Sequence, residues 1–157
     1  MSTEHKYTIE VKWTGNLGKG TQSSADYTRA HEISKKTSHV ILGSSDQAFS
    51  GSPERYNPEE LLLSTLSSCH VLMYLYFCSQ NKITVVDYID NAIGVMEEDE
   101  RGSGRFISAT LKPCIKILEK DKLKMATHLH HQSHDYCFIA NSINFPVNVE
   151  PEIEAVS

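Results

Sequence analysis

Four cysteines, Cys69, Cys78, Cys114 and Cys137, are the side chains of this 157-residue chain with the widest chemical scope. Thiolates attack peroxides, disulfides and acyl carbons, and they bind soft metals. No two of the four form a CxxC pair, and the opening residues MSTEHKYTIEV contain no apolar signal segment. We therefore expect free cytoplasmic thiols rather than a disulfide framework, so each cysteine is judged on its surroundings.

Cys69 lies within SSCHVL, in the middle of a long apolar stretch. A free cysteine in such a place commonly acts as a small buried hydrophobe. The two serines and the histidine around it are polar groups that need a reason to be buried, and this favours a reactive thiol. Cys78 follows about 13.5 Å further along a helix, too far for a disulfide with Cys69. We expect Cys78 and Cys114 to be bystanders.

Histidines gather just before Cys137, at positions 128, 130, 131 and 134. On a helix His130, His134 and Cys137 would share one face, so a zinc or copper site is an alternative to thiol chemistry. The glutamate of a HExxH metalloprotease helix is missing. Solvated helix histidines are the plainer interpretation. A metal or redox sensor that uses His134 and Cys137 is the second functional hypothesis.

The elements that position these side chains can be read from the sequence. Asn57 is a good helix N-cap, Pro58 suits the first turn, and the two glutamates that follow complement the helix dipole. From Leu61 to about Asn81 the chain is apolar on nearly every side, which predicts a helix of about five turns. Its serines, threonine and histidine favour a buried helix over a membrane span. Complete cover in so small a domain is hard, so we expect an interface with a second subunit.

The sequence predicts strands both before and after that helix. Alternation from Tyr7 to Trp13 predicts a half-buried strand that a second strand over 27–33 extends into a meander, and residues 43–57 predict a loop. Two β segments, 83–97 and 105–118, form a hairpin around 99–104. Asp121 caps a helix that ends near 136, a turn follows at 140–143, and 145–149 is a short strand. This order predicts a single α+β domain over 1–157.

Composition excludes some partners. The chain has 39% hydrophobic and 22% charged residues, so it is neither disordered nor a membrane bundle. Its net charge of -5 argues against a nucleic-acid partner, which usually requires a basic face.

The segment NPEELLLSTLSSCH at 57–70 resembles the signature of the OsmC/Ohr family of thiol peroxidases. The HxxC of 134–137 resembles the segment that carries that family's second cysteine, and WTGNLGKGT and NFPVNVEPEI are similar to the OsmC-like branch. Phe138 stands where the Ohr branch typically has proline. The resemblance implies an OsmC-like α+β fold, with antiparallel sheets around a long buried central helix and a second helix, in an intertwined homodimer.

The resemblance also implies a mechanism. Cys69 would reduce an organic hydroperoxide and become a sulfenic acid, and Cys137 would close a disulfide that an external dithiol, possibly of a lipoylated protein, reduces. An arginine would stabilise the Cys69 thiolate, with Arg29 preferred and Arg55 second, and Glu59 would hold the guanidinium. Neither a metal nor a cofactor is implied.

Helix geometry separates Glu59 from Cys69 by about 15 Å along one continuous helix. Either the helix begins irregularly after residue 60, or the glutamate comes from a partner subunit. Apolar side chains could line a pocket beside the thiols and favour alkyl or lipid hydroperoxides over hydrogen peroxide; the expected lining is Leu62, Leu66, Met73 and Phe138. A cysteine hydrolase is a third hypothesis, but His70 points about 100° away from Cys69 and cannot be its base.

Overall fold

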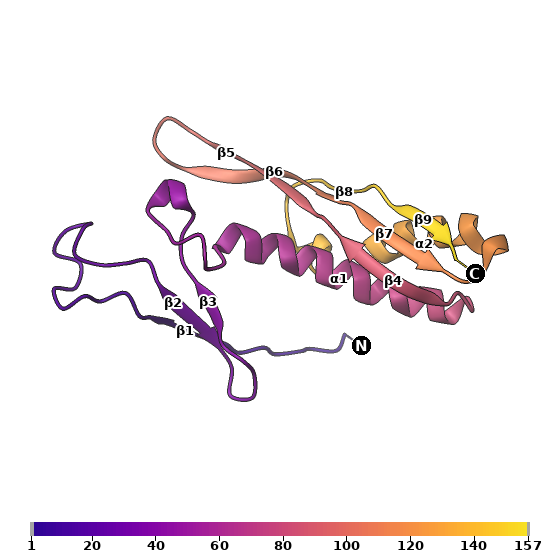
Figure 1. Cartoon of the computed structure of the whole chain (residues 1–157), viewed down its shortest axis with the longest axis horizontal. Coiled ribbons are helices and arrows are strands. Elements are labelled where there is room, and N and C mark those ends of the chain that lie inside the picture. Colours follow the sequence, from indigo (N-terminus) through magenta and orange to yellow (C-terminus); the bar gives the residue numbers. More distant parts are fainter. Residues whose placement is uncertain (1, 157) are drawn as a thin grey trace. The chain divides into compact units, whose positions relative to one another are not determined.

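The computed structural model describes residues 2–156, which form nine strands and two α-helices (Figure 1). The chain divides into two compact units, residues 1–61 and 62–157. The single domain expected over 1–157 stays a prediction.

The first unit is built on a three-stranded antiparallel sheet in the order β1-β2-β3. Its strands are β1, Glu10–Trp13; β2, His31–Ser34; and β3, Ile41–Gly43. Gly43 lies opposite His31, and a Cβ at this position would come within 2.2 Å of the imidazole. The close approach of the two strands therefore requires glycine there. A 3-10 helix, Gln47–Phe49, lies in the predicted 43–57 loop.

The half-buried strand predicted from Tyr7 to Trp13 is wrong in two respects. The strand begins only at Glu10, and all four alternating large side chains are exposed, from Trp13 at 42% to Tyr7 at 87%. Three strands of three or four residues cannot enclose a core by themselves, so this apolar row has no cover within its own unit.

The second unit contains two three-stranded sheets, β4-β7-β9 and β5-β6-β8. Their strands are β4, Val85–Asp90; β5, Ile93–Glu98; β6, Gly104–Leu111; β7, Pro113–Ile117; β8, Val147–Val149; and β9, Glu152–Ala155. β8 and β9 run parallel to β6 and β7. The sheets are thus mixed rather than antiparallel, because the chain returns to them through a helical crossover.

The predicted hairpin of 83–97 with 105–118 is split between these two sheets. β5 pairs with β6 around the turn at Asp99, as expected, but β4 pairs with β7 in the other sheet. At the junction the Lys112 N–H donates to Asp90 Oδ1 at 2.7 Å instead of to a strand neighbour. Because Asp90 satisfies the Lys112 N–H, the strand hydrogen bonds of one sheet can end here and those of the other sheet can begin.

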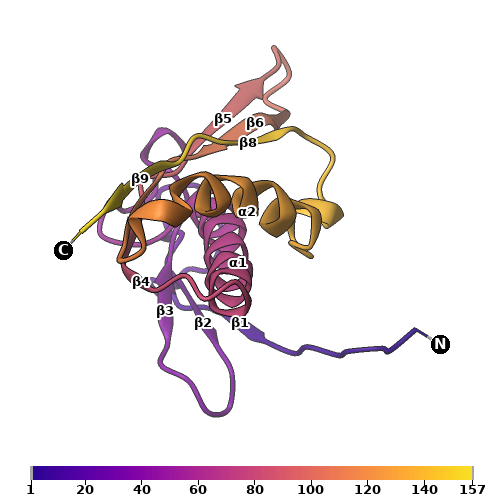
Figure 2. The same ribbon diagram turned by 90° about the vertical axis from the view of Figure 1, so that its right-hand side faces the viewer.

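Two α-helices complete the second unit: α1, Pro58–Gln80, which begins in the first unit, and α2, Leu123–Asp135. α2 lies across α1 (Figure 2). The predicted cap at Asp121 is wrong, because that residue lies in a 3-10 turn, Lys120–Lys122, and α2 starts two residues later. The expected turn near residue 140 is a 3-10 helix, Ala140–Ser142.

The core of the second unit forms between the two helices and β7. It contains Tyr74, Phe77 and Cys78 of α1, Ile115 and Ile117 of β7, Ala126 and Leu129 of α2, and Ile83. Among the described residues, α1 is the helix long and apolar enough to cross a membrane by length and composition alone. Part of this helix, Tyr74, Phe77 and Cys78, packs in the core of the second unit.

The complete cover expected for α1 is not reached within one chain. Leu72 is 67% exposed, and Leu75 and Tyr76 are exposed with it. These large side chains share one side of the helix, away from the core residues Tyr74 and Phe77. A row of this kind is unusual on the surface of a monomeric protein.

Candidate active site

The start of α1 is set by a reciprocal cap. Asn57 Oδ1 accepts the Glu60 N–H at 2.7 Å, and Glu60 Oε2 accepts the Asn57 N–H at 3.0 Å. The predicted N-cap is confirmed, and two backbone donors of the first turn are satisfied. The helix then runs without interruption from Pro58 to Gln80.

That unbroken run decides one of the alternatives left open by the sequence. An irregular start after residue 60 would have allowed Glu59 to fold back toward Cys69. Because the helix is regular from Pro58 onward, about 15 Å of axial rise separates Glu59 from Cys69. Within one chain the two side chains cannot share a site.

Cys69 and Cys137 lie together, although the sequence places them far apart. Cys69 is on α1 and is partly exposed, whereas Cys137 follows the end of α2 and is only 1% exposed. Burial and the hydrogen bond with the Cys69 thiol raise the pKa of Cys137 to about 11, against the opposing effect of the Ala140 N–H, which donates to its sulfur. At neutral pH Cys137 is therefore a protonated thiol that lies against a more accessible one.

A pair of buried histidines connects the same two helices next to the thiols. His70 Nε2 and His130 Nδ1 share a hydrogen bond of 2.9 Å, and both side chains are at most 2% exposed. Their rings are nearly parallel, and Tyr74 stacks on His130 with ring centres 3.9 Å apart. Burial lowers the pKa of His70 to about 4 and that of His130 to about 3. Both imidazoles are thus neutral at neutral pH.

The polar residues that interrupt the apolar helix have identifiable partners. Ser67 Oγ donates to Asp90 Oδ2 at 2.5 Å, which connects α1 to the end of β4. Ser68 Oγ donates to the Ser64 carbonyl one turn earlier. The sequence argument treated these groups as signs of a reactive thiol, but their partners are structural. The Asp90 carboxylate also opposes the burial effect on the pKa of His70.

The two arginine candidates have local partners in the first unit. Arg29 Nη1 donates to the carbonyls of Ser24 and Tyr27 at 3.0 and 3.1 Å, and its guanidinium lies 4.6 Å from the centre of the Tyr27 ring. Arg55 Nη1 donates to the His31 carbonyl at 3.3 Å. The ion pairs of residues 2–156 include neither arginine.

The four apolar candidates differ in exposure. Leu66 is 1% exposed and Met73 packs against the core, so both are structural within the chain. Leu62 is partly buried. Phe138, next to Cys137, is 75% exposed. Phe138 is thus the most accessible of the four, Leu62 and Met73 are partly buried, and Leu66 is enclosed.

The predicted three-ligand metal face does not form. His130 turns its Nδ1 to His70, while His128 and His131 are exposed, with ring centres 6.2 Å apart and ring planes tilted by 52°. Within the described part of the chain, no three His, Cys, Asp or Glu side chains gather closely enough to hold a metal ion. The shared face of His130, His134 and Cys137 therefore does not act as a ligand set in this structure.

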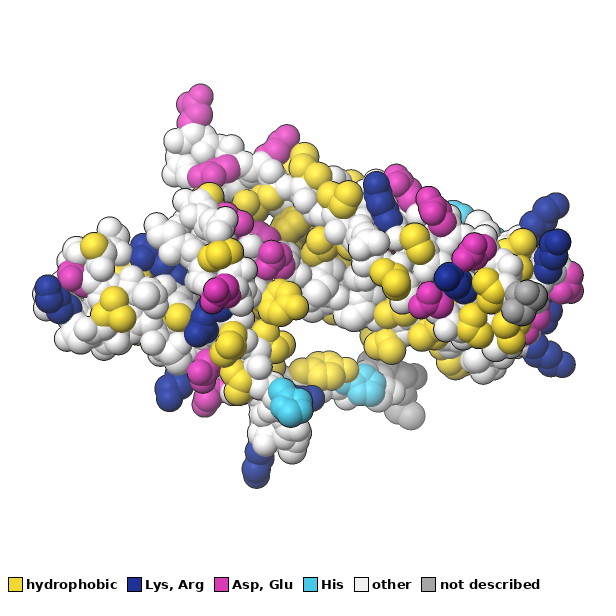
Figure 3. Space-filling view, in the orientation of Figure 1, with side chains coloured by type: hydrophobic (Ala, Val, Ile, Leu, Met, Phe, Trp, Pro, Cys, Tyr) yellow, Lys and Arg dark blue, Asp and Glu magenta, His cyan; other side chains and the backbone are white. Residues whose placement is uncertain are grey.

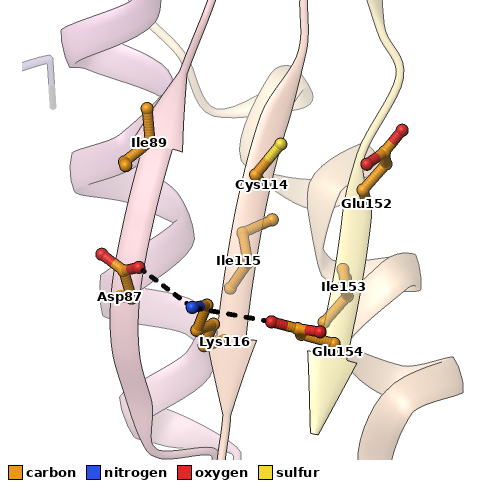
Figure 4. Close-up of a pocket in the computed structure, with 8 residues that line it drawn as sticks. All are labelled: Asp87, Ile89, Cys114, Ile115, Lys116, Glu152, Ile153 and Glu154. Carbon is orange, nitrogen blue, oxygen red and sulfur yellow. Dashed lines mark ion pairs between the residues drawn. The ribbon is translucent and has the colours of Figure 1, made fainter.

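Cys78 and Cys114 lie away from the thiol pair. Cys78 is buried in the core, and burial raises its pKa. Cys114 is exposed on β7, on the face of the sheet opposite Ile115 (Figure 4). It lines a hollow of about 370 Å³ crossed by ion pairs from Lys116 to Asp87 and Glu154. Hydrophobic, acidic and basic side chains mix over this face (Figure 3), as on an ordinary solvated sheet.

Sequence reasoning missed the partnership of His70 with His130. The sequence analysis takes His70 as a polar neighbour of Cys69 and rejects it as a base, and it takes His130 as a solvated helix histidine or a metal ligand. A signal was present, since a histidine on a helix this apolar needs a buried partner. Its identity depended on how α2 crosses α1.

The OsmC-like protein family matches residues 51–152, which is most of the chain and includes both α-helices and both thiols of the pair. The chain belongs to the OsmC-like family. None of the curated proteins matches it.

Solved structures of OsmC-like proteins agree with the fold. An OsmC-like protein of unknown function from Vibrio cholerae is 27% identical, with a TM-score of 0.84 over 94% of this chain and 99% of that one. An organic hydroperoxide resistance protein from Elizabethkingia anophelis is 16% identical, with a TM-score of 0.66 over 98% and 100% of the two chains. Another, from Legionella pneumophila, is 16% identical, with a TM-score of 0.66 over 96% and 99%.

Proposed function

We propose that this OsmC-like protein is a thiol peroxidase that reduces organic hydroperoxides to alcohols. The observation that carries the proposal is the contact between the Cys69 and Cys137 thiols, one partly exposed and the other buried. The names of the relatives from E. anophelis and L. pneumophila, both organic hydroperoxide resistance proteins, support the same chemistry.

The proposed reaction has three steps. The Cys69 thiolate attacks the outer oxygen of ROOH, the O–O bond breaks, and with one proton the products are Cys69–SOH and ROH. The Cys137 thiol displaces hydroxide from the sulfenic sulfur, which yields the disulfide and water. An external dithiol then reduces the disulfide by two exchange steps and becomes oxidised itself. A lipoylated protein is the proposed reductant.

In this proposal a guanidinium stabilises the Cys69 thiolate. Arg29 is the preferred candidate and Arg55 the second, and Glu59 of a partner subunit holds the arginine in place. The regular helix from Pro58 supports the partner assignment, because it keeps the chain's own Glu59 away from Cys69. Arginine suits this role because it stays charged and can contact a carboxylate and a peroxide oxygen at once.

A homodimer follows from the same proposal. Within the second unit, Leu72, Leu75 and Tyr76 leave a bare apolar row on α1. Within the first unit, the apolar side chains of β1 and of the residues before it are also exposed: Tyr7, Ile9, Val11 and Trp13. A second copy of the chain is the cover that we propose for both rows. The protein would act in the cytoplasm, where its thiols stay reduced.

The substrate is an alkyl or lipid hydroperoxide. We propose that the exposed Phe138, which follows Cys137 in the chain, and the partly buried Leu62 and Met73 of α1 form the apolar surface that binds it, whereas Leu66 is buried. Each buried CH₂ of a substrate contributes about 0.8 kcal/mol, an advantage that hydrogen peroxide does not have. We expect cumene hydroperoxide to react faster than hydrogen peroxide. The reverse order would exclude this surface as the binding site.

Steady-state peroxide consumption with dihydrolipoamide as reductant tests the function. Cys69→Ser should abolish turnover, and mass spectrometry of the wild type after one equivalent of peroxide should find a Cys69–Cys137 disulfide. Cys114→Ser, at an exposed thiol remote from the pair, is the matched control and should leave both unchanged. Disulfide formation without turnover would instead support the redox-sensor alternative.

A further inference from the structure

The hydrogen bond between His70 and His130 has no role in the chemistry described so far. Each histidine belongs to a helix that also carries or precedes a thiol of the pair. His70 is adjacent to Cys69 on α1, and His130 lies on α2, which ends at Asp135, two residues before Cys137. The bond therefore joins the two elements that must present the sulfurs to each other.

The pair is an unusual choice if stability alone is the aim. Two neutral imidazoles joined in this way share one proton, and in either arrangement His130 Nε2 has no hydrogen-bond partner among the described residues. A buried polar atom without a partner costs about 1–3 kcal/mol. Two leucines of similar volume would fill this space without that cost.

The histidine pair adds a directional constraint on how α1 and α2 pack against each other. An apolar contact between α1 and α2 tolerates sliding and rotation, because dispersion depends weakly on angle. The imidazole pair has one arrangement in which Nε2 meets Nδ1 at 2.9 Å while Tyr74 remains stacked at 3.9 Å. A shift of one helix along the other would leave two further buried nitrogens unpaired. The hydrogen bond between the two imidazoles therefore favours one relative position of α1 and α2.

We propose that His70 and His130 are positioning residues, whose hydrogen bond sets the α1–α2 crossing that keeps the Cys137 sulfur in contact with the Cys69 sulfur. The inference rests on the proposed function for its biological purpose, since a held resolving thiol shortens the life of the sulfenic acid. The contact itself belongs to the reduced protein and does not depend on peroxide chemistry.

Three variants separate direction from packing. His70→Leu/His130→Leu keeps the volume and removes the hydrogen bond. His70→Gln/His130→Asn restores a directional bond, because a glutamine amide takes the place of Nε2 and an asparagine amide that of Nδ1. His128→Leu, on the exposed side of α2, is the matched control.

The deciding measurement is the thiol–disulfide equilibrium of the pair in glutathione buffers, in which oxidised glutathione forms the Cys69–Cys137 bond and two reduced glutathiones are released. A displacement of about 1 Å can cost up to a hundredfold in intramolecular reactions. We expect the effective concentration of the two thiols to fall at least about tenfold in the leucine variant. It should recover to within about threefold in the amide variant and stay unchanged in His128→Leu.

Two further readouts keep the outcomes distinct. The melting temperature of the leucine variant should equal or exceed that of the wild type. A fall in the effective concentration of the two thiols could then not be explained by unfolding of the variant. Trapping of Cys69–SOH with a 1,3-dione should show an unchanged first step and a longer-lived sulfenic acid. An unchanged effective concentration in the leucine variant would overturn the positioning role. Absence of any sulfenic acid in the wild type would overturn the proposed function alone.

Discussion

The buried histidine pair makes the stability of this protein depend on pH. Burial lowers the pKa of His70 to about 4 and that of His130 to about 3, each from an ordinary value of 6.5. The neighbouring groups have smaller effects: Asp90 raises the pKa of His70 and His134 lowers it, while His70 and then His131 lower the pKa of His130. In the unfolded chain both imidazoles take up protons below about pH 6.5.

The sign and the size follow from proton linkage. The stabilisation is fully present above pH 6.5 and is lost as the pH falls toward the two folded-state values, because the unfolded chain binds more protons. Each pKa unit corresponds to about 1.4 kcal/mol, so each histidine loses about 2 kcal/mol of unfolding free energy between pH 7 and pH 5. The pair loses up to about 4 kcal/mol, a large part of the 5–15 kcal/mol that is typical of a domain.

Urea unfolding at pH 7 and pH 5 measures this loss directly. The wild type should lose up to about 4 kcal/mol, and His70→Leu/His130→Leu should lose much less. Subtracting the variant's loss of unfolding free energy from that of the wild type removes the contribution of the other titrating groups. An equal loss in both proteins would mean that the imidazoles are not neutral and buried together, and the account of the α1–α2 contact would fail with it.

Three further outcomes are expected. Asn57→Ala removes the acceptor of the Glu60 N–H and should lower the unfolding free energy by about 1 kcal/mol, as measured by urea unfolding. Arg29→Ala should slow sulfenic acid formation at Cys69 by at least about tenfold, and Arg55→Ala by less; the opposite ranking would exchange their roles. Tyr88→Phe removes a buried hydroxyl that has no partner among the described residues, so the melting temperature should stay equal or rise.

Local chemistry made α1 predictable. A capping residue, a proline in the first turn, two glutamates and more than twenty residues without a helix breaker are signals contained in neighbouring positions. The helix therefore begins and ends as expected, at Pro58 and Gln80. The turn around Asp99 was predictable for the same reason, because its side chain binds the backbone of the next residues.

Pairing between distant strands was not predictable in the same way. The two long β segments were recognised, but their division between two sheets depends on the Asp90–Lys112 contact and on where the chain returns after α2. A strand's own pattern specifies which face is apolar, and it carries no information on which neighbour lies beside it. The exposed row of β1 shows the same gap, since alternation cannot say what covers the apolar side.

The sequence by itself determined the central helix, its capped start, and the family resemblance, carried mainly by residues 57–70 and 134–137, that singled out Cys69 and Cys137. Tertiary structure alone decided that Cys69 and Cys137 are in contact and that His70 has His130 as its partner. The physical reason is common to both. Helix periodicity sets positions along one element, whereas the approach of two elements depends on packing between residues that the sequence keeps far apart.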